Sequence, residues 1–141
     1  MEPRFSPPTL EDTKRLASQW LSASKLAEEE FSRPLDQSQA DLATIQRLLD
    51  DDVVDRGKYS LQCLGVALGR VMIRNIQGLD WWMVEDEFGR DSCLRYLDTT
   101  IQVNPLTMIS KRVERGETVD VANLFEQTKT SLATMKDRYL A

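Results

Sequence analysis

The residues with the greatest potential for chemistry lie in the stretch GLDWWMVEDEFGRD, which begins at Gly78. Two tryptophans lead into three successive carboxylates, and a glycine follows. Carboxylates can ligate hard cations or act as acids and bases, and an exposed tryptophan can anchor a protein partner. The stretch therefore offers a partner-binding surface or a carboxylate site, built from Trp81, Trp82, Glu85, Asp86, Glu87 and Asp91.

Alternation along a strand limits what these carboxylates can do together. Adjacent side chains of a strand point to opposite faces, so Glu85 and Glu87 share one face and Asp86 lies on the other. The three acids converge on one ion only where a bulge or turn bends the chain. A strand that leaves the core and ends in water explains them without a ligand. A partner-binding acidic edge and an oxygen-ligated metal site are the alternatives.

A second charged group lies in the segment ISKRVERGE. Lys111 and Arg115 are four residues apart, so they share one side of a helix, and Arg112 lies beside them. These cations could bind a phosphate or carboxylate, or pair inside the fold with the acidic stretch, for example Asp86 with Arg112. They could also complement the negative end of the helix dipole.

Histidine is absent from the chain, which excludes several kinds of catalytic site. Neither a Ser–His nor a Cys–His nucleophile pair can form, and no imidazole can hold zinc. Cys63 and Cys93 are too few for a disulfide framework and are expected to be buried thiols. No glycine-rich phosphate loop or dinucleotide fingerprint is present, so no cofactor and no metal site are predicted.

The composition is that of an ordinary globular protein with one domain. The chain has 141 residues, 41% of them hydrophobic and 29% charged, and a net charge of −5. Residues 1–57 contain 12 acidic and 7 basic residues, so the excess negative charge lies there. The chain has no basic stripe, no apolar run of about 20 residues and no signal-like N-terminus. We therefore expect a cytoplasmic protein that binds neither nucleic acid nor membranes.

Hydrophobic periodicity and capping residues predict five helices and three short strands. Thr9 precedes an apolar-periodic run with Asp12 three residues later, which is typical of a helix start. Asn104 followed by Pro105 predicts another helix start. The expected helices cover 10–31, a segment capped by Asp36 or Ser38 and ending near Asp50, then 59–75, 105–115 and 121–139. The expected strands cover 80–88, 91–96 and 99–103.

These elements predict an α+β fold in which helices pack on a small antiparallel meander, in the order ααα-βββ-αα. Residues 1–9 are expected to form an extended arm before a single domain at 10–141. Gly65 and Gly69 each cost a helix about 1 kcal/mol relative to alanine, so we expect another backbone to approach them closely. The expected buried side of the last helix consists of Val121, Phe125, Leu132, Met135 and Tyr139.

Several of these positions together resemble an uncharacterised bacterial family known only as a domain of unknown function. The resemblance covers about residues 45–130 and implies a bacterial, single-domain α+β protein without an assigned reaction. It is carried by Leu64, Gly65 and Gly69, by Trp81 or Trp82 with Asp86 and Gly89, by Pro105, and by Ile109, Lys111, Arg112, Glu114 and Gly116.

The sequence favours a protein that binds rather than one that catalyses a reaction. The main hypothesis is a small acidic interaction module that meets a protein partner through the acidic hairpin, as immunity proteins and inhibitors meet a basic toxin or enzyme. The alternative is an enzyme that uses carboxylates and a divalent cation near Asp86, with Lys111 or Arg112 holding an anionic substrate. A homodimer formed through an exposed tryptophan is a third hypothesis.

Overall fold

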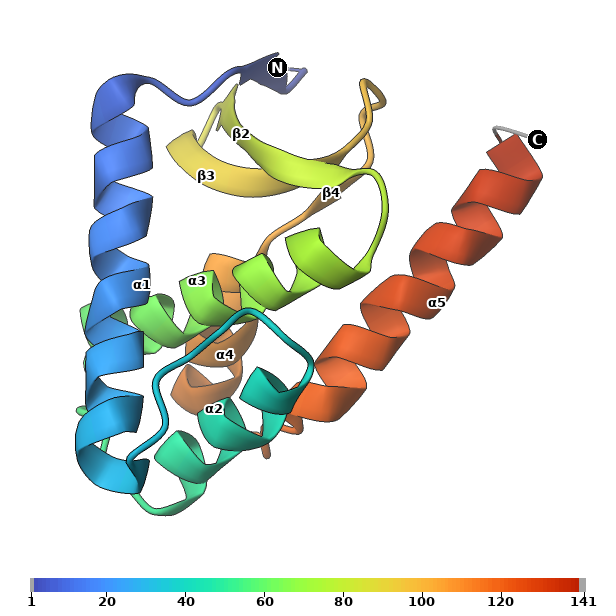
Figure 1. Ribbon diagram of the computed structural model, residues 1–141. Helices are drawn as coiled ribbons and strands as arrows, with labels where there is room; N and C mark the ends of the chain where they lie inside the picture. Colours follow the sequence, from blue (N-terminus) through green and yellow to red (C-terminus); the bar gives the residue numbers. More distant parts are fainter. Residues whose placement is uncertain (1, 140–141) are drawn as a thin grey trace.

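The computed structural model describes residues 2–139 and shows an α+β protein with a four-stranded antiparallel sheet beside five helices (Figure 1). The fold class and the order of the helices match the prediction. In chain order the elements are β1 (Arg4–Ser6), α1 (Leu10–Phe31), α2 (Ala40–Asp50), α3 (Lys58–Asn75), β2 (Leu79–Asp86), β3 (Gly89–Tyr96), β4 (Gln102–Val103), α4 (Pro105–Glu114) and α5 (Val121–Tyr139).

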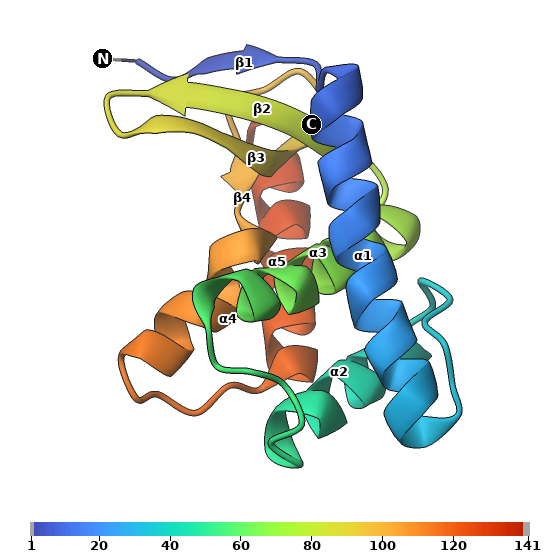
Figure 2. The ribbon, with the colours of Figure 1, turned by 90° about the vertical axis from the view of Figure 1, so that its left-hand side faces the viewer.

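The sheet contains a strand that the sequence pattern did not predict. Within the expected arm, β1 pairs antiparallel with β2, and Phe5 lies opposite Val84. The strand order is β1-β2-β3-β4, so β2 is an inner strand and not an edge (Figure 2). The expected strand at 99–103 is reduced to two residues, because Thr99 donates its backbone N–H to the carbonyl of Tyr96 and forms a turn.

Local hydrogen bonds explain where the first two helices begin. Thr9 and Asp12 form the expected reciprocal capping box at the start of α1. The expected cap of α2 is wrong, because neither Asp36 nor Ser38 caps that helix, which begins after Gln39. Instead Asp36 accepts hydrogen bonds from Ser38, which lower the pKa of Asp36 to about 2. Asp41 accepts the backbone N–H groups of Asp36 and Gln37.

Helix α3 crosses the middle of the molecule, and its small residues permit close packing. A Cβ atom at Gly65 would lie 2.7 Å from the Cα of Leu106, and one at Gly69 would lie 2.8 Å from the Trp81 ring. The backbone approach expected at these glycines is therefore present at Gly65, where α4 begins. Asn104 does not cap α4 with its side chain, although Pro105 occupies the first turn as predicted.

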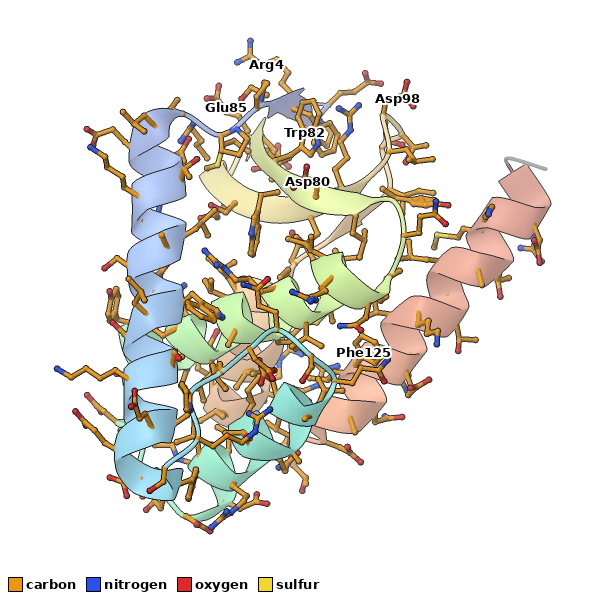
Figure 3. The ribbon with its side chains drawn as sticks, in the orientation of Figure 1. Arg4, Asp80, Trp82, Glu85, Asp98 and Phe125 are labelled. Atoms are coloured by element: carbon orange, nitrogen blue, oxygen red, sulfur yellow. The ribbon has the colours of Figure 1, made fainter. Side chains whose placement is uncertain are left out.

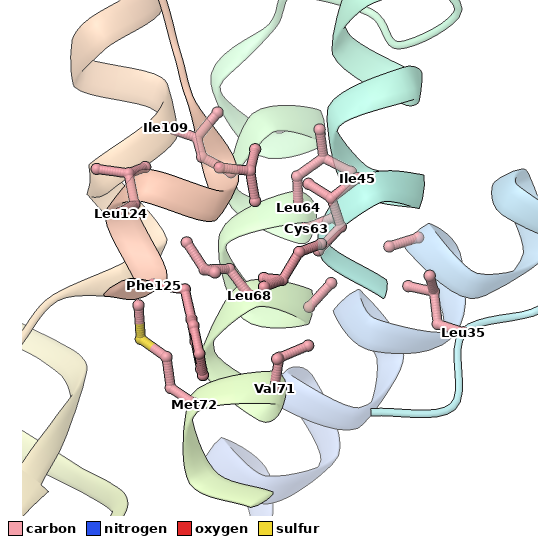
Figure 4. Close-up of a cluster of buried hydrophobic side chains, with 14 of the residues drawn as sticks. Leu35, Ile45, Cys63, Leu64, Leu68, Val71, Met72, Ile109, Leu124 and Phe125 are labelled. Carbon is pink, nitrogen blue, oxygen red and sulfur yellow. The ribbon is translucent and has the colours of Figure 1, made fainter. Parts of the chain in front are cut away.

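The core lies between α3 and the helices around it (Figure 4). Helix α5 supplies Val121, Phe125 and Leu132 to this core, whereas Met135 is 36% exposed and was wrongly expected to be buried. Figure 1 shows the C-terminal half of α5 standing clear of the other helices. The side chain of Tyr139 lies outside the described part of the structure. Within residues 2–139, no helix combines the length and apolar character needed to cross a bilayer.

Candidate functional site

The β2–β3 hairpin carries the acidic stretch, and its two tryptophans lie on opposite faces as expected. Trp81 faces α3, where its ring lies against Gly69 and joins the core. Trp82 lies on the other face, where the Arg95 guanidinium sits 4.6 Å from the Trp82 ring and 4.5 Å from the Phe5 ring. Both tryptophans are half-buried. Neither presents a fully exposed ring to a partner.

The carboxylates of the hairpin are held apart by separate partners. Glu85 pairs with Arg4 on β1 at 2.7 Å, and both side chains remain largely exposed (Figure 3). Asp86 accepts the backbone N–H of Phe88 at 2.8 Å, which shapes the turn. Glu87 and Asp91 are exposed. The sequence-predicted acids therefore share one end of the sheet but do not converge on one point.

Phe88 is the main surface feature of the hairpin that the sequence prediction missed. Its side chain is 89% exposed. Phe88 lies in the turn, after the acidic residues at the end of β2 and before Gly89, which begins β3. We define the hairpin tip as residues 86–89. Strand alternation assigned Phe88 to a face of β2, but β2 ends at Asp86 and the turn directs the ring into solvent. The neighbouring Gly89, with a φ of 121°, was the available signal that the strand ends before Phe88.

An ion pair between exposed Arg90 and a buried carboxylate fixes the hairpin to the first helix. Arg90 donates to both carboxylate oxygens of Asp12, at 3.0 Å and 2.6 Å, and Arg15 contacts the same carboxylate. Asp12 is 2% exposed, and the hydrogen bond from Arg90, followed by those from Thr9, holds its pKa far below the usual range of an aspartate. The hairpin tip is therefore presented on a fixed base and not on a free loop.

Both thiols are buried, and the acidic side chains of the described residues are spread apart. Burial raises the pKa of Cys93 to about 11, and it also raises the pKa of Cys63. In the described residues, no three aspartate, glutamate or cysteine side chains are grouped closely enough to hold a metal ion. The carboxylate of Asp12 accepts hydrogen bonds from Arg90 and Thr9.

The predicted cations line a separate surface hollow. Lys111, Arg112 and Arg115 border a groove of about 430 Å³ between β4, α4 and α5, which we call the basic groove. The suggested ion pair of Asp86 with Arg112 is not formed, because Arg112 donates instead to the carbonyl of Met108 within α4. Across residues 2–139, no salt bridge joins the hairpin acids to these cations. Lys111 also lines a neighbouring hollow together with Asp86, Gly89 and Asp91, so the acidic and basic groups of the described chain adjoin there without forming a salt bridge.

Comparison with known proteins gives a family and a fold. A crystal structure from Bacteroides thetaiotaomicron VPI-5482 matches with a TM-score of 0.84 at 15% sequence identity, over 91% of this chain. The match spans only 47% of that chain, so this chain covers about half of its length. No curated protein matches significantly. Residues 41–125 match the model of a domain of unknown function, and the chain therefore belongs to the DUF3806 family.

Proposed function

We propose that the protein is a non-enzymatic interaction module that binds a protein partner through the hairpin tip. The observation that carries this proposal is the 89% exposure of Phe88 between Asp86 and the turn glycine, with Glu87 exposed beside it. An exposed aromatic ring next to carboxylates suits a partner with an apolar pocket and a cationic rim.

The fixed base of the hairpin supports this role. Arg90 joins β3 to Asp12 on α1, while β1 pairs with β2 from Arg4 to Ser6. A surface that is already ordered loses less conformational entropy on binding than a mobile loop does. The tip is therefore suited to insertion into a preformed pocket.

A partner with a cationic rim is also what an immunity-like or inhibitor-like role would require, and the size and charge of this protein suggest that role. The anchor differs from the one expected, since Trp81 is packed against α3 and Trp82 is stacked on Arg95. Phe88 takes the anchoring role in this proposal, and Glu87, Asp86 and Asp91 supply the negative rim. Glu85 forms a salt bridge with Arg4, so it contributes less negative charge to the rim.

Affinity capture from host lysate tests the proposal when matched variants are compared. The test variant is Glu87→Lys with Phe88→Ala. The control variant is Glu30→Lys with Leu21→Ala, because Leu21 is 59% exposed on α1 and the charge change is identical. Circular dichroism and urea denaturation first establish that both variants fold like the wild type.

The expected result is one partner retained by the wild type and the control and lost by the test variant. With the purified partner, loss of a central aromatic anchor is expected to weaken binding by about thirtyfold or more. Equal retention by all three proteins, or equal loss by both variants, would rule out the hairpin tip as the binding surface.

A further inference from the structure

We propose that the basic groove binds a small amphipathic carboxylate, with an anionic head at the cations of α4 and an apolar chain along α5. No residue of the hairpin tip lines the groove, although Lys111 also borders a neighbouring hollow with Asp86 and Gly89. The groove residues used in the argument are Met108, Lys111, Arg115, Leu132 and Met135.

The charge of the lining is entirely positive. Lys111, Arg112 and Arg115 border the groove, and no aspartate or glutamate does. The acids nearest along the chain, Glu114 and Glu117, do not line it. Throughout the part of the chain that the structure describes, Lys111 and Arg115 have no side-chain hydrogen bond or ion pair. Their charges are therefore available to an anion.

These cations are not needed to complete the end of their own helix. The carbonyl groups of Lys111, Arg112 and Val113 accept backbone N–H groups from Arg115, Glu117 and Gly116 respectively. Side chains often satisfy such carbonyls at a helix C-terminus, but here the backbone does so. Only Arg112 turns back, to the carbonyl of Met108.

Apolar side chains form the floor of the groove at the place where α5 leaves the core. Leu124 and Leu132 are buried below it, and Met108 and Met135 form part of its walls. A volume of about 430 Å³ falls in the range of small-molecule sites and suits a chain of moderate length. Methionine side chains adapt readily to varied apolar ligands.

Head and tail chemistry together define the ligand class. A carboxylate gains charge-assisted hydrogen bonds from lysine and arginine, and the attached chain buries apolar surface against the methionines and leucines. A small inorganic anion would use only the cations, and a neutral alcohol would use only the floor. Binding should therefore require both parts of one molecule.

Isothermal titration calorimetry with decanoate as the probe tests this directly, with decanol and acetate as single-feature controls. The test variant is Lys111→Ala with Arg115→Ala. The matched control is Lys129→Ala with Lys136→Ala, which removes the same charge from a separate groove on the other side of α5. Thermal denaturation verifies that both variants are folded.

We expect one decanoate per chain, with decanol and acetate bound at least about tenfold more weakly. The test variant should lose about tenfold or more in affinity, and the control should lose less than about threefold. Ser131→Glu, inside the groove, should also abolish binding, while Ala133→Glu should not. No saturable binding, equal binding of decanol, or equal loss in both double variants would overturn the proposal.

Discussion

Asp12 shows how one residue can hold two distant parts of the chain together. It lies in the first turn of α1, caps that helix through Thr9, and receives both nitrogen donors of Arg90 from the hairpin. A carboxylate that is 2% exposed and fully engaged stabilises the fold, because its replacement leaves Arg90 without its charged partner.

We expect Asp12→Asn to lower the free energy of unfolding at pH 7 by about 2 kcal/mol, since charge-assisted hydrogen bonds are lost. The folded pKa of Asp12 is depressed, so its contribution is complete above the unfolded pKa of about 4 and is lost as pH falls toward the folded pKa. Urea denaturation at pH 7 and pH 3 measures this. A difference between wild type and variant that grows toward pH 3 would contradict the assignment.

The two thiols give a second test at the residue scale. Burial raises the pKa of Cys93 to about 11, and Cys63 shifts in the same direction for the same reason. Because the thiolate is the reactive form, neither cysteine should react quickly with a disulfide reagent at pH 8 in the folded protein. Both should react at once in urea. Rapid labelling of the folded chain would instead favour a thiol-dependent activity.

The packing of α3 on α4 depends on the absence of side chains at two positions. A Cβ atom added at Gly65 would collide with the backbone of Leu106, which cannot move without shifting α4. The glycines therefore lower the helix propensity of α3 but allow α4 to pack closely against it. The cations at the C-terminal end of α4 lie across the basic groove from α5.

Gly65→Ala should destabilise the protein by about 2 kcal/mol, because the overpacking cost exceeds the roughly 1 kcal/mol gain in helix propensity. Chemical denaturation gives the value. Arg74→Ala, at the exposed end of α3, serves as the control and should change stability by less than about 0.5 kcal/mol. If Gly65→Ala were neutral or stabilising, the close approach of α4 would not exist in solution.

Strand β1 covers part of the outer face of the sheet through a stacked trio. The Arg95 guanidinium packs over both the Phe5 ring and the Trp82 ring, and it also donates to the carbonyl of Thr99 at 2.6 Å. Phe5→Ala should expose Trp82 and cost about 1 kcal/mol. Tryptophan emission should move to longer wavelength, and emission unchanged from the wild type would indicate that β1 does not dock.

At the scale of the whole molecule, local signals predicted the helices well and the contacts between elements poorly. The Thr9–Asp12 pattern located the start of α1 because capping is a local interaction. The pairing of β1 with β2 joins residues about 80 positions apart, and no periodicity within a three-residue strand reveals it. The prediction that Met135 is buried was wrong for a similar reason. The point at which α5 leaves the core depends on the rest of the fold.

The candidate surfaces were predicted in composition but not in geometry. Alternation correctly separated Trp81 from Trp82 and showed that the acids would diverge, because it follows from strand geometry. It could not show that Phe88 leaves the strand, or that Arg90 is directed to Asp12. Those outcomes depend on the turn and on the position of α1.

The hairpin tip and the basic groove carry opposite charges, and Lys111 borders both the groove and a neighbouring hollow lined by Asp86 and Asp91. The hairpin tip presents Phe88 and Glu87, whereas the groove presents Lys111 and Arg115. Among residues 2–139, no salt bridge joins an acid of the hairpin tip to a cation of the groove. We therefore propose that the tip recognises a protein and that the groove binds a small anion.

The most direct test of the central claim is photo-crosslinking in the living host from a photoreactive phenylalanine analogue placed at position 88. We expect one discrete, light-dependent adduct that contains a partner protein and disappears when Glu87→Lys is added. The same analogue at position 21, on exposed α1, should not give this adduct. No adduct from position 88, or the same adducts from both positions, would contradict recognition through the hairpin tip.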